Sequence, residues 1–76
     1  MTAYFTHAKP FDDEHYFMHT YEINVNYDVI KNVSRIVITN MDTKKYALMY
    51  IQTTDVEKDE LFDMAKTIIM SRGFTI

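Results

Sequence analysis

The sequence of 76 residues contains no cysteine, no tryptophan, one glycine and one proline. Without cysteine, neither a disulfide nor a thiolate metal site can form, and a cysteine nucleophile is excluded. A single glycine excludes a glycine-rich loop of the kind that binds phosphate groups. The fold must therefore be stabilised by packing of its own core or by association with another chain.

Long apolar runs and an excess of basic residues are also missing. No segment approaches the ~18 apolar residues that a transmembrane helix needs, and the first ten residues lack the apolar stretch of a signal peptide. The formal net charge is −3, which disfavours a general nucleic-acid binder. We expect a cytoplasmic protein without a cofactor. The frequent Ile, Asn, Asp, Lys and Tyr indicate AT-rich coding, which is typical of low-GC bacteria and their phages.

Hydrophobic residues, at 47% of the chain, are numerous enough for one folded domain over residues 1–76. Residues 17–30 alternate between apolar and polar side chains, which predicts a strand with one buried face. Residues 33–39 are rich in β-branched side chains and predict a second strand, with Ile36 and Ile38 on one face. Residues 45–53 are apolar on both faces and predict a third strand, either central or covered on both sides.

Residues 55–72 change to helical periodicity. Thr54 and Glu57 fit a capping box at the helix start, and Gly73 stands where a left-handed residue often ends a helix. The expected apolar stripe comprises Leu61, Met64, Ala65, Ile68 and Arg72, widened by Phe62 and Ile69.

Together these segments predict an α+β fold. Its core, residues 17–76, is a three-stranded antiparallel meander with one C-terminal helix packed on one face. Residues 1–16 form an N-terminal arm that adds a short strand or helix, and Pro10 interrupts it.

Two histidines four residues apart, His15 and His19, follow a run of acidic residues. On a helix both could reach one metal ion. On a strand they lie about 13 Å apart, too far to share one. The β-forming residues around them favour the strand, so no metal is expected, and His15 and His19 stay low-ranking candidates for a metal site.

Acidic side chains gather in the N-terminal arm and at the start of the helix. Such a surface, in a chain rich in Tyr and Met, predicts docking on a basic partner. The expected function is a small non-enzymatic protein-binding module, such as a phage or mobile-element inhibitor that covers the working surface of a host protein, for example a nucleic-acid-processing one. The predicted contact residues are Asp12, Asp13, Glu14, Asp55, Asp59, Glu60 and Asp63.

The alternative is a nucleic-acid-binding module that uses a basic strip and stacking tyrosines on the sheet. Its residues are Lys31, Arg35, Lys44, Lys45, Tyr46 and Tyr50. Apolar and aromatic side chains exceed what one helix can cover, so we also expect a homodimer.

Overall fold

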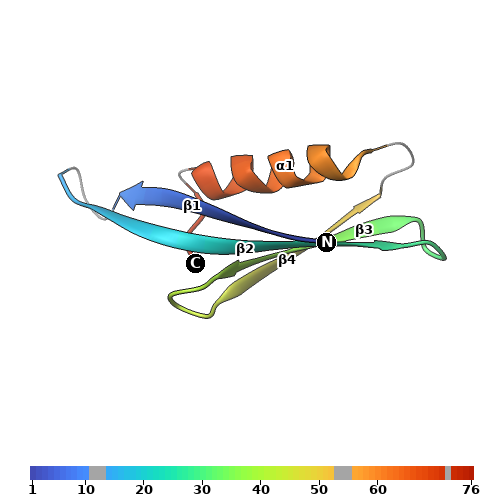
Figure 1. Cartoon of the computed structure of the whole chain (residues 1–76), viewed down its shortest axis with the longest axis horizontal. Coiled ribbons are helices and arrows are strands. Elements are labelled where there is room, and N and C mark those ends of the chain that lie inside the picture. Colours follow the sequence, from blue (N-terminus) through green and yellow to red (C-terminus); the bar gives the residue numbers. More distant parts are fainter. Residues whose placement is uncertain (11–13, 53–55, 72) are drawn as a thin grey trace.

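The computed structural model describes residues 1–10, 14–52, 56–71 and 73–76. They form a four-stranded antiparallel sheet in the order β1-β2-β3-β4, with one helix packed on one face (Figure 1). The elements are β1 (Thr2–Pro10), β2 (Tyr16–Asp28), β3 (Val33–Asn40), β4 (Tyr46–Gln52) and α1 (Lys58–Met70). The molecule is elongated, at 46 × 20 × 17 Å. The predicted α+β class, antiparallel sheet and C-terminal helix are confirmed.

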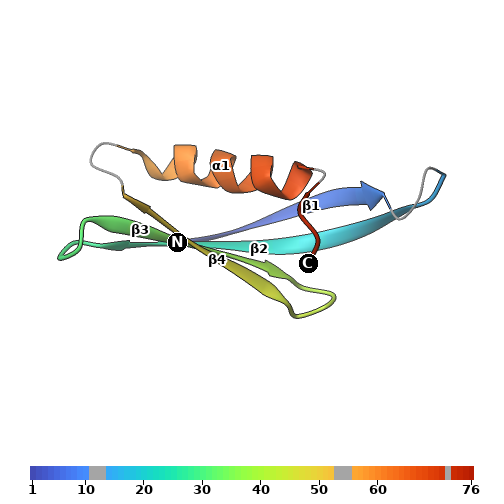
Figure 2. The same ribbon diagram turned by 180° about the vertical axis from the view of Figure 1, so that it is seen from behind.

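The N-terminal arm provides the edge strand β1, the strand option of the prediction, so the sheet has four strands. β1 pairs with β2 along its whole length, from Thr2 opposite Asn24 to Pro10 opposite Tyr16. The strand ends at Pro10, as the sequence predicted, and Pro10 itself still pairs because proline is tolerated at an edge where its missing N–H is not needed for the ladder. The β1–β2 hairpin projects beyond the C-terminal end of α1 (Figures 1 and 2).

The predicted alternation in β2 and β3 builds the core. Tyr21, Ile23 and Val25 of β2 are buried, as are Ile36 and Ile38 of β3. Ile23 lies directly opposite Ile38, and Val25 opposite Ile36. Because side chains alternate across a strand, this register places all five on the face toward α1. We call this the covered face and the opposite side the open face.

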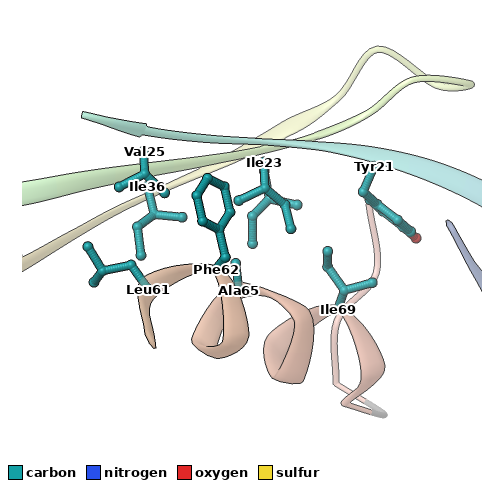
Figure 3. Packing of buried hydrophobic residues seen from close by; sticks show 9 residues of the cluster. Tyr21, Ile23, Val25, Ile36, Leu61, Phe62, Ala65 and Ile69 are labelled. Atoms are coloured by element: carbon teal, nitrogen blue, oxygen red, sulfur yellow. The ribbon is translucent and has the colours of Figure 1, made fainter. Parts of the chain in front are cut away.

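The helix packs on the sheet through Leu61, Phe62, Ala65 and Ile69. All four are buried, and Figure 3 shows them pointing at Tyr21, Ile23, Val25 and Ile36 of the sheet. Met64, predicted in the apolar stripe, is instead 41% exposed. These four side chains form one apolar stripe along α1, so only one side of the helix packs on the sheet.

Both predicted helix ends are corrected. α1 begins at Lys58, and Glu57 is an extended N-cap residue without a side-chain cap. Glu57 therefore does not take the capping-box role, and its predicted partner Thr54 lies outside the described residues. At the other end, Ser71 is the extended C-cap residue and its hydroxyl donates to the Ile68 carbonyl. Gly73 has no positive φ, so it is not the predicted left-handed residue. Arg72, predicted in the stripe, lies outside the described residues.

The segment after α1 crosses back to the sheet beyond the helix end (Figure 2). Phe74 packs against Tyr21 with ring centroids 5.9 Å apart. The buried Asn40 donates to the Ile76 carbonyl at 2.8 Å and accepts from the backbone N–H groups of Asp42 and Thr43. Asn40 thus ties the C-terminal segment and the β3–β4 turn to one point.

β4 is an edge strand, which corrects the prediction of a central or doubly covered strand. It pairs only with β3 in the described sheet. The backbone of α1 lies close to β1, β2 and β3 and not to β4 within the described residues, and only the margin of the buried cluster contacts Met49 and Ile51. Ala47, Met49 and Ile51 consequently stay half-buried on the covered face, and the alternate side chains are exposed on the open face.

Candidate binding surface

The open face carries no helix in the part of the chain that the structure describes. The part of its β1–β2 half near the N-terminus is polar, and hydrogen bonds cross it between strands, from Tyr4 Oη to Glu22 Oε2 at 3.2 Å and from Asn24 Nδ2 to Thr2 Oγ1 at 3.2 Å. These polar side chains thus already have partners within the sheet. Toward the tip of the β1–β2 hairpin the same face instead exposes Tyr16 at 64% and Met18 at 65%.

The β3–β4 half of the open face is apolar and aromatic. Leu48 and Val37 lie opposite each other, as do Tyr50 and Arg35. Tyr46 is 67% exposed, Tyr50 65% and Leu48 46%. We define the β3–β4 surface as the open-face side chains Val33, Arg35, Val37, Tyr46, Leu48 and Tyr50. Arg35 is the sole charged residue within these two strands.

The β2–β3 hairpin extends this surface at one end. Val29 is 78% and Ile30 96% exposed in the turn. The turn is held by Asp28 Oδ1, which accepts from the backbone N–H groups of Ile30 and Lys31, and by Asn32 at φ 53°. A hollow here is lined by this turn together with Val33, Arg35 and Tyr50.

Charge is distributed unevenly along the chain. Residues 29–52 contain four cations, Lys31, Arg35, Lys44 and Lys45, and one acid, Asp42, which gives a net charge of +3. Since the whole chain carries −3, the remaining residues carry −6. The β3–β4 hairpin is therefore a basic region in an acidic protein.

The predicted nucleic-acid-binding residues lie on or beside this surface. Arg35, Tyr46 and Tyr50 share the open face of neighbouring strands. Lys44 and Lys45 are exposed in the turn before Tyr46, and Lys31 is exposed in the hairpin at the other end of β3. The structure thus places this set along β3, β4 and the two turns that flank β3.

The predicted acidic residues are placed differently. Asp59, Glu60 and Asp63 are exposed on α1, which lies over the covered face. Glu14 is exposed in the β1–β2 connection, at the end of the molecule away from the start of α1 (Figure 1). These four residues do not form one patch. Asp12, Asp13 and Asp55 lie outside the described residues.

The histidines are extended, as the strand prediction requires. His15 precedes β2, and His19 lies within it, directly opposite His7. His19 Nδ1 donates to Asp42 Oδ2 at 3.1 Å, so His19 has a carboxylate partner from the β3–β4 turn. No group of three His, Asp or Glu side chains that could hold a metal ion occurs in residues 1–10, 14–52, 56–71 and 73–76.

Two polar groups lie against Phe74 at the end of the core. The Lys9 ammonium donates to the Phe74 carbonyl and lies 4.1 Å from the centroid of its ring. Burial lowers the pKa of Lys9. Tyr21 is fully buried, and its hydroxyl has no hydrogen-bond partner among the described residues. Burial, together with the negative charge of Asp42, raises the pKa of Tyr21. This cluster anchors the C-terminal segment.

Sequence reasoning missed Leu48, Val33 and Val37 as surface residues. The sequence does contain a signal for these three residues, because they alternate onto the same strand face as Arg35, Tyr46 and Tyr50. The missing information was which face the helix covers.

No helix in the described ranges has the length and apolar character needed to cross a membrane. Comparisons of the chain with protein-family models, curated proteins and solved structures give no match.

Proposed function

We propose that this protein is a non-enzymatic protein-binding module and that its docking site is the β3–β4 surface. The observation that carries the proposal is the composition of this surface, in which exposed Tyr46, Leu48 and Tyr50 form one row and Tyr50 lies opposite Arg35. Tyr and Arg are enriched in the energetic centres of protein interfaces, whereas Lys, Glu and Asp are depleted there.

The rigidity of the sheet suits this role. The sheet is held by its ladder and by α1 from behind, so the surface is preorganised and little ordering is needed on binding. A rigid face of this kind acts by occlusion, covering the working surface of the partner.

The charges around the surface define the partner. The centre is apolar apart from Arg35, and Lys31, Lys44 and Lys45 stand at its two ends. The complementary partner therefore has an apolar patch flanked by carboxylates, which would also accelerate association. This proposal shifts the contact from the predicted acidic residues, which lie on α1 and at Glu14, to the opposite side of the sheet.

A photo-crosslinking amino acid tests the proposal by position. Placed at Tyr50, it is expected to capture a protein from a lysate of the host cell; placed at Asp63 on α1, it is not. The captured protein is then purified and its affinity measured for two variants. Arg35→Glu is expected to weaken binding at least tenfold, about 1.4 kcal/mol, whereas Asp63→Lys leaves it unchanged. Capture from Asp63, or a loss of affinity in Asp63→Lys alone, would support the acidic surface instead.

A second function is favoured by the same set of residues. Tyr46 and Tyr50 lie four residues apart on one face with Arg35 beside Tyr50, an arrangement on which unpaired bases can stack. Single-stranded nucleic acid is the ligand in this case. The test is binding of a labelled oligothymidylate at low salt. Affinity that declines with salt and is lost in Tyr50→Ala would establish this function, and absence of binding eliminates it.

A further inference from the structure

The outer edge of β4 pairs with no other strand among the described residues. Asn40 N–H donates to the Lys45 carbonyl, so in the β3–β4 register Ala47, Met49 and Ile51 bond to β3. Tyr46, Leu48, Tyr50 and Gln52 therefore direct their N–H and C=O groups away from the sheet. The chemistry that satisfies such a row is another strand.

Nothing in the sequence of β4 blocks a strand from adding there. Its seven residues, Tyr46–Gln52, contain no charge, proline or glycine. Natural sheets usually protect their edges with such residues. α1 makes no close backbone approach to β4 in the described structure, and Met49 and Ile51 lie half-buried at the margin of the core cluster.

The opposite edge, β1, is protected. Pro10 stands at an outward position of the ladder, where it removes the donor that an added strand would use. α1 packs on β1, and the charged Asp59, Asp63 and Lys66 line the hollow beside its first residues. The contrast between the two edges indicates that an added strand would pair with β4 and not with β1.

We propose that two copies of this chain pair through β4 in antiparallel orientation, forming a continuous eight-stranded sheet about a two-fold axis. The register with the greatest overlap places Met49 opposite Met49 of the second copy. It brings the outward residues together as hydrogen-bonded pairs, Tyr46 with Gln52 and Leu48 with Tyr50, and forms about eight backbone hydrogen bonds. The two-fold axis is perpendicular to the sheet, so both copies of α1 lie on the same face.

The side chains of β4 and the cations beside it favour a second copy of this chain as the added strand, in antiparallel orientation. On the covered face Ala47 meets Ile51 and Met49 meets itself; on the open face Leu48 meets Tyr50. Such apolar cross-strand pairs stabilise a sheet. The cations of the β3–β4 turn separate, because Lys45 and its counterpart lie about 27 Å apart along the strands. Parallel pairing in register would place them side by side.

The oligomeric state and two variants test the proposal. In sedimentation analysis at tens of micromolar, the chain is expected at twice its mass of 9.1 kDa. Leu48→Lys is expected to raise the dissociation constant at least tenfold, because it places a charge opposite Tyr50 in each half. Tyr4→Lys, the matched open-face change on the β1 edge, is expected to leave it unchanged. A monomeric wild type, or equal effects of the two variants, would overturn the proposal.

The absence of cysteine permits a test of the register itself. In the proposed dimer the two Met49 Cα atoms face each other in a non-hydrogen-bonded pair about 4.5 Å apart, within disulfide range. The two Ala47 Cα atoms lie about 14 Å apart. Met49→Cys is therefore expected to crosslink rapidly on mild oxidation and Ala47→Cys slowly. Equal rates for both would contradict the pairing. Neither readout depends on the proposed partner of the β3–β4 surface.

Discussion

The two faces of the sheet use the same strands and similar residues, with opposite results. On the covered face Tyr21, Ile23 and Ile38 have no exposed surface, whereas on the open face Tyr4, Tyr46 and Tyr50 are 65–67% exposed. The difference does not come from hydrophobicity alone, because both faces carry large side chains. The difference arises because the one helix and the short C-terminal segment can cover only one face of the sheet.

This comparison separates stability from binding. Apolar area removed from water contributes about 25 cal/mol per Å² to folding, so the covered face accounts for the stability of the monomer. The open face contributes little to folding and is therefore free to vary for binding. Substitutions on the two faces are expected to have effects of different size and kind.

The largest effect is expected in the core. Ile38→Ala removes buried methyl groups beneath α1 and should lower the free energy of unfolding by about 2–5 kcal/mol. Because a domain of this size has little stability to lose, Ile38→Val provides a graded version at about 0.5–1.5 kcal/mol. Tyr4→Ala on the open face should cost much less. Urea unfolding followed by circular dichroism, at one protein concentration, measures all three; a Tyr4→Ala loss equal to that of Ile38→Val would refute the assignment of the faces.

A smaller loss is expected at Asn40, which with Ser34 is a buried polar residue on the covered face. Asn40→Ala removes three hydrogen bonds, to the backbone of Asp42, Thr43 and Ile76, and leaves buried groups without partners. The expected cost is about 1–3 kcal/mol. Thr39→Ala, one residue away on the open face, should cost less. Equal losses in urea unfolding would show that Asn40 does not anchor the C-terminal segment.

Tyr21→Phe is expected to raise the free energy of unfolding at pH 7 by about 1 kcal/mol or less. The buried Tyr21 hydroxyl has no partner among the described residues, so it carries a desolvation cost that the variant removes. The pH dependence has a defined sign. The pKa of Tyr21 is raised by burial from 10.0, so the folded state keeps this proton while the unfolded state loses it. Stability attributable to Tyr21 is therefore complete below pH 10 and declines as the pH rises above it.

The matched experiment compares unfolding of wild type, Tyr21→Phe and Tyr4→Phe at neutral pH and above pH 10. The alkaline loss should be smaller in Tyr21→Phe only. An equal loss in all three proteins would exclude Tyr21 as its source.

The smallest effect concerns the turn that supports the β3–β4 surface. Lys44 has φ 64°, a left-handed conformation that costs a residue with a Cβ about 1–2 kcal/mol. Lys44→Gly relieves this cost but adds chain entropy to the unfolded state, so a net gain of less than about 1 kcal/mol is expected. Lys45 does not have a positive φ, so Lys45→Gly should lower the free energy of unfolding. A loss in both variants would contradict the assigned turn.

The sequence predicted those parts of the fold that depend on local periodicity. The alternation of Tyr21, Ile23 and Val25 identified the buried face of β2, and helical spacing identified α1. The ends of α1 were less predictable, because Glu57 and Ser71 take extended conformations that depend on the connecting segments. Pro10 was predicted to interrupt the N-terminal segment, and β1 does end there.

The candidate site could be predicted only in part. Tyr46, Tyr50 and Arg35 were identified as one option, but apolar character on both faces of β4 indicated a covered strand. Periodicity describes the two faces of a strand and does not give the order of strands in a sheet or the face that a helix will choose. The position of β4 at the edge follows from the meander topology, which only pairing between strands defines.

That topology also has a consequence for how the chain reaches its fold. Every strand pairs with the strand before it, so three hairpins can form with short loop closures. α1 is the exception, because it packs on β1, β2 and β3 and must meet β1 across nearly the whole chain. We expect the sheet to form early and the docking of α1 to complete folding. Until then both faces of the sheet are alike in being open to solvent, and the arrival of the helix makes them different.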